Sequence, residues 1–181
     1  DAIVRDVLDF ARDLVVRPEA IEMSDLIEAA IDSPRFDEQF AEPADGANEG
    51  SPRVTVRVEA GAEVVFCDRS LGLQAWLSVV ENARQATAGR GCGSESEIEV
   101  FARPCRVRTG PDESVEGVAI GVRDHGPGID PGVLERMFNP FFTTRETGTG
   151  LGLAIVHRIV DAHGGSVVVR NNSEIDGGSG A

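Results

Sequence analysis

The chain has 181 residues and a formal net charge of −14, with 41% hydrophobic and 27% charged residues. This composition is typical of a folded globular protein, and no apolar run approaches the ~18 residues that span a membrane. The strong acidity disfavours nucleic acid as a partner, because binding a phosphate backbone needs a cationic surface. The first residue is Asp1, so we expect a piece of a longer protein that could be membrane-anchored upstream.

The first 17 residues repeat apolar side chains at helical spacing, at Ile3, Val7, Phe10 and Leu14. A stripe this wide favours a helix bundle or coiled-coil seam, and Pro18 ends it. We therefore predict that residues 1–17 are the end of a dimerisation helix. A helix packed on its own domain is the alternative.

The rest of the chain divides into a short stretch, residues 18–52, and a larger unit, residues 53–181. Ser24 can cap a short helix to about Ile31, and the acidic, Gly- and Pro-rich text of residues 32–52 indicates a connector. In the larger unit, "RVTVRVEA" alternates as in a half-buried strand with Val54, Val56 and Val58 on one face. Further predicted elements are a strand at "VVFC", a helix over residues 70–88 capped by Asp68, a strand pair at 97–108 and 116–124, a helix around Leu151, Ile155 and Ile159 ended by Gly164 and Gly165, and a last strand at 166–170. Such an order predicts an α+β fold in which helices cover one face of a mixed sheet.

A glycine-rich stretch, "GTGLGLAIV", leads into the last of these helices. Gly148, Gly150 and Gly152 would let main-chain N–H groups at a helix start approach an anion closely. Glycine-rich turns before helices are common, however, so this stretch alone predicts phosphate binding only weakly.

The turn "RDHGPGID" follows an apolar strand. Asp124 could accept a hydrogen bond from an exocyclic amine, and Gly126 and Gly128 would make room for a flat base. Because Asp, Gly and Pro also form turns with no ligand, a plain turn is the alternative.

Ser78, Asn82 and Gln85 form a polar stripe on the apolar helix "LQAWLSVVENARQAT". An amide oxygen at Asn82 could bind Mg²⁺ while the metal keeps most of its waters. An exposed helix face is the alternative for this stripe.

Taken in order, "ENARQA", "DHGPGID", "FNPFF" and "GTGLGL" resemble the N, G1, F and G2 boxes of sensor histidine kinase ATP-binding domains, which belong to the GHKL superfamily. The resemblance covers about residues 67–169. "LDFAR" and "FFTTR-ETGTGLGLAIV" look most like the nitrogen-regulation branch. The resemblance implies a two-layer α/β sandwich of the Bergerat type, with ATP bound between helices and sheet under a lid.

The resemblance also implies site residues. Asn82 would bind Mg²⁺ and take part in catalysis with Arg145, which would lie near the terminal phosphate, and Asp124 would hold the adenine amino group. The glycines Gly126 and Gly128 would pass beside the base. The main chain of Gly148, Gly150, Leu151 and Gly152 would contact phosphates. The full set of expected nucleotide-binding residues is Asn82, Gln85, Asp124, Gly126, Gly128, Ile129, Phe138, Thr143, Thr144, Arg145, Gly148, Thr149, Gly150, Leu151 and Gly152.

The sequence departs from the family pattern in three ways. Ser78 stands where the family commonly has Asn and the related hydrolases have a water-activating Glu, which argues against an ATP hydrolase. None of His125, His157 and His163 has a phosphoacceptor context, so we expect them to be structural or solvated. The chain also stops at "GGSGA", so we expect the final strand of the fold to be missing.

The resemblance thus implies a protein-histidine kinase that uses ATP and Mg²⁺ and transfers the γ-phosphoryl to a histidine on a dimerisation domain outside this chain. A response-regulator receiver domain would be the next acceptor, and the full-length protein would be a homodimer. The three cysteines form no close pair, which indicates free thiols and a cytoplasmic location. The alternative is a nucleotide-binding scaffold or phosphotransfer protein of the same fold with reduced activity, because Ser78 would weaken the metal site.

Overall fold

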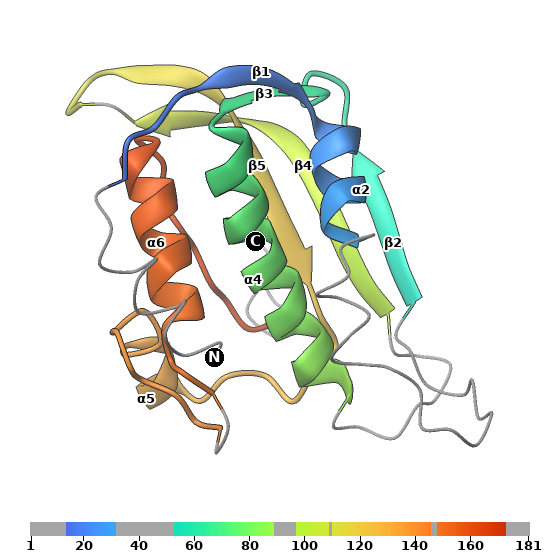
Figure 1. The fold of residues 1–181 in the computed structure, drawn as a ribbon, viewed down its shortest axis with the longest axis vertical. Coiled ribbons are helices and arrows are strands. Elements are labelled where there is room, and N and C mark those ends of the chain that lie inside the picture. The colour runs from blue at the N-terminus through green and yellow to red at the C-terminus, as the bar shows by residue number, and fades with distance from the viewer. Residues whose placement is uncertain (1–13, 32–52, 89–96, 109, 146–147, 173–181) are drawn as a thin grey trace, which may run out of the picture.

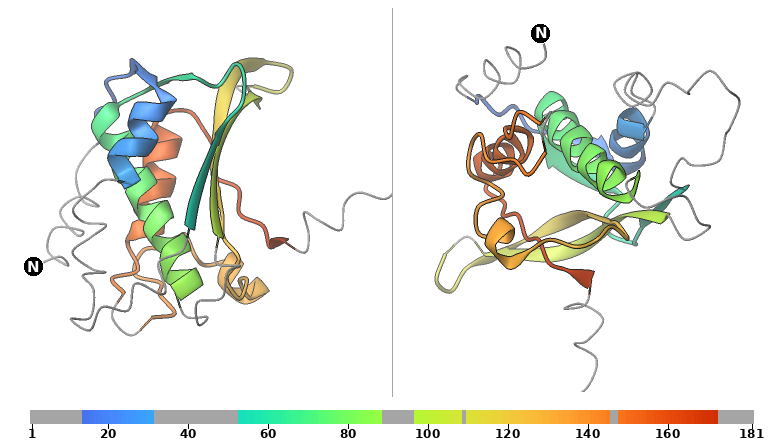
Figure 2. Two further views of the ribbon diagram at one scale, coloured as in Figure 1. Left: turned by 90° about the vertical axis from the view of Figure 1, so that its right-hand side faces the viewer. Right: turned by 90° about the horizontal axis from the view of Figure 1, so that it is seen from below.

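A computed structural model of the chain describes residues 14–31, 53–88, 97–108, 110–145 and 148–172. They form two layers, one of helices and one of strands, which Figure 2 shows edge-on. The helices are α2 (Met23–Ile31), α4 (Arg69–Ala88), α5 (Pro131–Leu134) and α6 (Gly152–Ala162). The strands are β1 (Glu19–Glu22), β2 (Arg53–Val58), β3 (Val64–Cys67), β4 (Glu97–Arg108) and β5 (Ser114–Arg123).

The main sheet has the order β2-β4-β5, with β2 parallel to β4 and β4 antiparallel to β5. Helices α2, α4 and α6 lie side by side across one face of it (Figures 1 and 2). Strands β1 and β3 form a separate antiparallel ribbon over one end of the helices. The predicted α+β fold with a mixed sheet covered on one face is confirmed.

The main core fills the space between the helices and the sheet. It contains Val80 of α4 and Val100 of β4, both fully buried. The other buried members are Met23, Ile27, Ala30, Ala62, Trp76 and Ala102. Because α2 supplies three of these side chains and β1 pairs with β3, residues 19–31 pack into the same unit as the sheet.

A second cluster joins α6 to α4. The predicted apolar stripe of α6 is confirmed, since Leu151, Ile155 and Ile159 are all buried and pack against Leu71 and Ala75. The predicted end of this helix is also confirmed, because Gly164 takes a φ of 72° and donates its N–H to the Asp161 carbonyl. The cluster thus packs α6 against the first half of α4.

The cap of α4 forms as predicted. Asp68 Oδ1 accepts hydrogen bonds from the N–H groups of Ser70 and Leu71, each at 3.1 Å. These are donors that the first turn of a helix cannot satisfy internally. The pKa of the Asp68 carboxyl is lowered, mainly by the Leu71 N–H.

Some elements differ from the prediction. The sequence did not predict β1, because "EAIE" contains one large apolar residue and becomes a strand only through its ladder with β3. Helix α5 was also missed, and α2 begins at Met23, one residue before the expected cap. On the edge strand β2, Val54 packs against the core, whereas Val56 is 48% exposed, so the valine face is less buried than expected.

The predicted last strand at residues 166–170 is wrong. Its burial alternates as in a strand, with Val167 and Val169 half-buried and Val168 exposed, yet it has no assigned strand structure and joins neither sheet of the described residues. Alternating burial means only that one side of the segment faces the protein and the other faces solvent. A strand also needs a ladder of main-chain hydrogen bonds to a neighbouring strand. The segment is followed instead by Asn171 and Asn172, whose side chains hydrogen-bond to the turn after β5.

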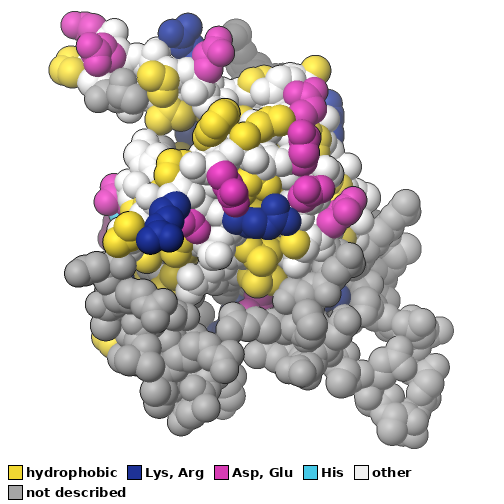
Figure 3. Space-filling model, turned by 45° about the horizontal axis from the view of Figure 1, so that its top comes forward, with side chains coloured by type: hydrophobic (Ala, Val, Ile, Leu, Met, Phe, Trp, Pro, Cys, Tyr) yellow, Lys and Arg dark blue, Asp and Glu magenta, His cyan; other side chains and the backbone are white. Residues whose placement is uncertain are grey.

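The predictions for residues 1–13 and 32–52, and for Cys92, lie outside the described residues. Cys67 and Cys105 are free cysteines, as predicted. Within the described part of the chain, no helix is long and apolar enough to cross a membrane. The face in Figure 3 mixes acidic and hydrophobic side chains with fewer basic ones, in keeping with the net charge of −14.

Candidate functional site

The polar stripe of α4 is organised by its own helix. Asn82 Nδ2 donates to the Ser78 carbonyl at 2.8 Å, and Gln85 Nε2 donates to Glu81 Oε1 at 2.9 Å. With the two NH₂ groups bound to neighbours one turn back, both amide oxygens face away from those neighbours. The half-buried stripe therefore presents acceptors at its surface.

These two oxygens meet a side chain from a distant part of the chain. Arg145 Nη1 donates to Asn82 Oδ1 at 3.2 Å and also to Gln85 Oε1. The contact spans 63 residues to Asn82, so it brings two of the predicted site segments together. The structure thus brings Asn82, Gln85 and Arg145 into contact with one another.

We call residues 138–145 and 148–150 the lid segment, after the role expected of them. Its beginning packs through aromatic rings. The Phe138 ring lies 5.4 Å from that of His157 on α6, and the Arg136 guanidinium lies 4.6 Å from the Phe142 ring. Residues 139–141 and 143–145 of the segment are exposed, whereas Phe138 and Phe142 are half-buried.

A small turn shapes the exposed part of the lid segment. The Arg145 N–H donates to Thr143 Oγ1 at 3.1 Å, and that hydroxyl lies 3.4 Å from the Arg145 carbonyl. Gly148 lies close by, since a Cβ there would stand 2.6 Å from Thr143 Oγ1. Thr143 thus links the two sides of the segment, and Thr144 lies between the linked residues.

The lid segment ends at the start of α6. Gly150 has a φ of 68°, and a Cβ on it would lie 2.5 Å from the Phe141 carbonyl carbon. Leu151 is the N-cap residue and is buried, and its N–H donates to Thr149 Oγ1 at 3.4 Å. A Cβ on Gly152 would lie 4.0 Å from Ser78 Oγ. The first turn of α6 therefore sits against the polar stripe of α4.

Residues 124–129, which we call the Asp124 turn, lie at the other end of the stripe. Asp124 Oδ1 accepts from the Gly126 N–H at 2.8 Å. A Cβ on Gly126 would come within 3.0 Å of Ala86 Cβ on α4, one residue beyond Gln85. Helix α4 thus contacts the Asp124 turn and the lid segment with neighbouring parts of one surface.

Two residues that hold this turn were missed by the sequence analysis. Asn171 hydrogen-bonds to Ile129, and Asn172 hydrogen-bonds to the Asp124 carbonyl. The only signal in the sequence is a pair of asparagines after an apolar run, which is too common to single out a site. Their hydrogen-bond partners lie more than 40 residues away in the sequence, so only the fold brings them together.

The three histidines occupy three different parts of the structure. His163 Nε2 accepts the Asp68 N–H at 2.9 Å and its Nδ1 lies 2.7 Å from the Ile159 carbonyl, so its ring joins the cap of α4 to the end of α6. His157 is exposed beside Phe138, and His125 is exposed in the Asp124 turn.

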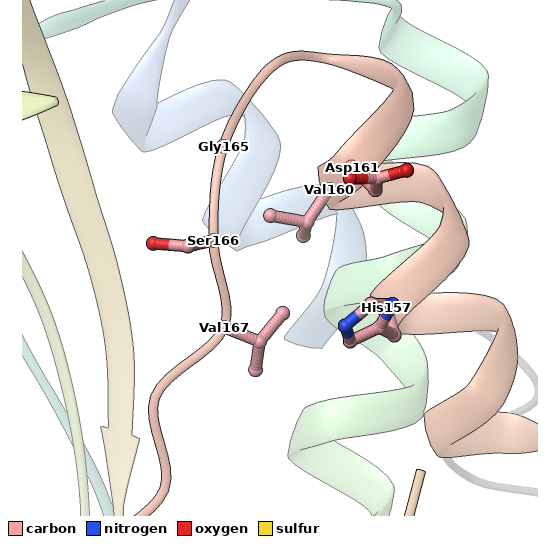
Figure 4. Close-up of a pocket in the computed structure, with 6 residues that line it drawn as sticks. All are labelled: His157, Val160, Asp161, Gly165, Ser166 and Val167. Atoms are coloured by element: carbon pink, nitrogen blue, oxygen red, sulfur yellow. The ribbon is translucent and has the colours of Figure 1, made fainter. Parts of the chain in front are cut away.

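Two further features bear on ligands. In the described residues no group of three or more His, Cys, Asp or Glu side chains could hold a metal ion, so a metal at α4 would depend on amide and ligand oxygens. A cavity of about 170 Å³ lies between α6 and the segment after it. Figure 4 shows Val160 and Val167 pointing toward each other there, while the Ser166 hydroxyl points away. None of the predicted site residues lines this cavity.

Comparison with known proteins gives a consistent result. Residues 67–181 match the family model described as histidine kinase-, DNA gyrase B-, and HSP90-like ATPase. The sensory histidine kinase/phosphatase NtrB of Rhizobium meliloti is 36% identical over 107 residues, which is 57% of this chain and 28% of that protein. The chain spans less than a third of the length of the first curated relatives it matches.

Solved structures share the fold. Full-length ShkA in complex with AMPPNP is 26% identical, with a TM-score of 0.61 over 90% of this chain and 31% of that chain. Histidine kinase ThkA in complex with the response regulator TrrA is 23% identical, with a TM-score of 0.59 over 91% of this chain and 40% of that chain.

Proposed function

Because this chain belongs to the histidine kinase-, DNA gyrase B-, and HSP90-like ATPase family, as the resemblance predicted, we propose that it is the catalytic ATP-binding domain of a sensor histidine kinase. It would transfer the γ-phosphoryl of ATP to a histidine on a dimerisation domain outside this chain. A response-regulator receiver domain would then accept the phosphoryl group, as the ThkA–TrrA complex suggests for a structural neighbour. The full-length protein would act as a homodimer in the cytoplasm, with residues 1–17 ending its dimerisation helix.

The observation that supports this proposal most directly is the contact between Arg145 and the α4 amides. It joins the lid segment to the helix that borders both the Asp124 turn and the start of α6. A nucleotide lying along α4 would meet the base-recognising turn at one end and the lid segment at the other. This arrangement suits ATP better than a ligand without a phosphate chain.

Mg²⁺ fits the same place. Asn82 Oδ1 and Gln85 Oε1 both accept from one guanidinium nitrogen, so they already converge on a positively charged group. Asn82 would hold the ion, and phosphate oxygens and waters would complete its oxygen shell. The ion would supply charge neutralisation between the phosphates.

The residues of the chain would position the nucleotide. Asp124 would accept a hydrogen bond from the adenine amine, and Gly126 and Gly128 would let the base approach the main chain. N–H groups of Gly150, Leu151 and Gly152 at the start of α6 would face phosphate oxygens. Arg145 would turn from the α4 amides to the terminal phosphate and offset its charge during transfer.

The histidine acceptor would have to come from outside the chain. His163 lies at the far end of α6, about 16 Å from its first residue at 1.5 Å per residue. His157 packs on Phe138, and His125 belongs to the base end of the site. Transfer needs the acceptor in line with the phosphorus at about 3–3.5 Å, and we expect none of the three to reach that position.

Transfer in trans tests the proposal. The chain is incubated with γ-labelled ATP and Mg²⁺, alone and with a separately produced, histidine-bearing dimerisation helix pair. We expect acid-labile label on the added helices and none on the chain. Nucleotide binding without any transfer would favour the scaffold alternative. Label on the chain itself that disappears in His157→Gln would show that the chain carries its own acceptor.

A further inference from the structure

The Asp124 turn is weakly held by packing. Its members are exposed or half-buried, and none reaches the core: His125, Pro127 and Gly128 are exposed, and Asp124, Gly126 and Ile129 are half-buried. Burial of apolar area therefore cannot fix its shape, and hydrogen bonds must do so. One of these bonds comes from Asp124 itself, and the others come from Asn171 and Asn172, more than 40 residues away in the sequence.

Asn171 pairs with the main chain of Ile129 through both the oxygen and the nitrogen of its side-chain amide. Its Oδ1 accepts the Ile129 N–H at 2.8 Å, and its Nδ2 donates to the Ile129 carbonyl at 2.9 Å. This exchange reproduces the hydrogen-bonded pair of an antiparallel ladder, with a side chain in place of the second strand. Gly128 fits the same contact, because its φ is 80° and a Cβ on it would lie 3.1 Å from Asn171 Oδ1.

Asn172 holds the opposite end of the turn. Its Nδ2 donates to the Asp124 carbonyl at 2.8 Å, and its Oδ1 accepts from Arg123 Nε at 3.2 Å. The Arg123 contact orients the amide so that its NH₂ group faces the turn. Both ends of the turn are therefore bonded to consecutive side chains.

We propose that Asn171 and Asn172 are positioning residues that fix the Asp124 turn and thereby set the preference for adenine over guanine. The proposal rests on the proposed function, in which Asp124 accepts from the adenine amine. Guanine presents a carbonyl at the same edge and would face the carboxylate. Discrimination of this kind requires the carboxylate to stay in place, since a turn that can shift would let the carboxylate move away from the guanine carbonyl.

Binding of ADP and GDP to the full 181-residue chain tests this proposal. The variants are Asn171→Asp, which keeps the shape but sets an oxygen against the Ile129 carbonyl, and Asn172→Ala. Arg170→Gln is the matched control, because Arg170 is the exposed neighbour of the pair. We expect each Asn variant to weaken ADP about five- to tenfold, with a smaller effect on GDP, and the control to change neither.

The ratio of the two dissociation constants separates positioning from mere stability. A variant that only lowers the folded fraction raises both constants by the same factor and leaves the ratio unchanged. We therefore expect the GDP/ADP ratio to fall in both Asn variants. Asn172→Ser is a milder replacement if Asn172→Ala unfolds, and thermal melts of each chain report the folded fraction.

Asp124→Ala distinguishes failure of this inference from failure of the proposed function. If Asp124→Ala lowers the ratio and the Asn variants leave it unchanged, the positioning role is wrong and the nucleotide site stands. If the unmodified chain binds ADP and GDP equally, or if Asp124→Ala has no effect, the base-recognition role of the turn fails and the inference fails with it.

Discussion

The Asp124 turn and the lid segment border the same helix but are held in different ways. The Asp124 turn is tied at both ends by side-chain amides and internally by the Asp124 carboxylate. The exposed part of the lid segment depends on the Thr143 turn and on Arg145, whose partners are the α4 amides. One end of the proposed site is thus built before any ligand arrives, whereas the other is held by a charged side chain that a ligand could redirect.

The difference has a physical reason. Recognising a flat base needs a fixed acceptor, and ordering that acceptor in advance lowers the entropy lost on binding. Phosphates instead bring charge that can repay the ordering of an exposed segment at the moment of binding. A cation at Asn82 and a lid that follows the phosphates fit this second kind of recognition.

The largest effect should come from Asn82→Ala, which removes the proposed Mg²⁺ ligand from the lid end of the site. We expect phosphotransfer to the added helices to fall about 100-fold or more, by analogy with the loss of one preorganised electrostatic group. ATP binding should weaken more with Mg²⁺ than in its absence. Transfer assays and titrations with and without the metal measure both effects.

Gln85→Ala is the matched control for Asn82→Ala. It also removes an acceptor of Arg145 but leaves the proposed metal ligand intact. We expect a smaller loss that is similar with and without Mg²⁺. Equal losses for Asn82→Ala in the two conditions would count against Asn82 as a metal ligand and would leave it as a partner of Arg145 only.

The next largest effect should come from Gly150→Ala, and comparison with Gly164→Ala separates the cost of tight packing from the cost of backbone conformation alone. Gly150 and Gly164 have similar φ values, 68° and 72°, but a Cβ on Gly150 would meet the Phe141–Phe142 main chain, while nothing lies within 4 Å of one on Gly164. Gly150→Ala should weaken ATP about tenfold or more, because the left-handed conformation costs about 1–2 kcal/mol and the contact adds to it.

Gly164→Ala should destabilise the fold by about 1 kcal/mol without changing ATP affinity. Thermal melts and ATP titrations of the two variants give the comparison. If both variants lost ATP affinity equally, the close contact between Gly150 and the Phe141–Phe142 main chain would not be what supports ATP binding.

Much of this framework could be predicted from the sequence, because its signals are local. The stripe Leu151, Ile155 and Ile159 and the cap at Asp68 follow from helical spacing and side-chain chemistry within a few residues. The ordered boxes brought Asn82, Asp124 and Arg145 into one hypothesis, and the structure brings Asn82 and Arg145 into contact.

The rest depends on contacts between distant residues. Strand β1 exists through its pairing with β3, and residues 166–170 keep an alternating pattern without a ladder partner among the described strands. Asn171 and Asn172 act on a turn more than 40 residues away. Propensity and periodicity carry no information on such pairings, so only the fold could bring these residues to attention.

Hydrogen exchange should record the difference between the two regions directly. We expect amides of residues 143–145 and 148–149 to become at least about tenfold slower when a non-hydrolysable ATP analogue binds, because phosphate contacts order an exposed segment. Gly126 and Ile129 already donate to Asp124 and Asn171, so their exchange should change less. Unchanged exchange in the lid segment would show that its assignment as a lid is wrong.

The smallest effect concerns Asp68, which caps the end of α4 remote from both regions. N–H donors, first Leu71 and then Arg17 and Ser70, hold the pKa of its carboxyl below the usual range, and the nearby His163 adds to this. A lowered pKa means that the charged form stabilises the fold above the unfolded value, near pH 4, and that this contribution disappears as the pH falls through the folded value. Asp68→Asn keeps a capping oxygen but removes the charge, so the chain and its variant should differ by about 0.5–1 kcal/mol at pH 7 and converge below about pH 4. Urea unfolding from pH 3 to pH 7 measures the difference, with ATP affinity at pH 7 as the second readout.

Because the Asp124 turn and the lid segment contact α4 from Ser78 to Ala86, about 15 Å or more along the helix from Asp68, ATP affinity should not change in Asp68→Asn. A loss of affinity larger than the unfolded fraction explains would mean that the two regions depend on the placement of the whole helix, and the contrast between them would then be one of degree.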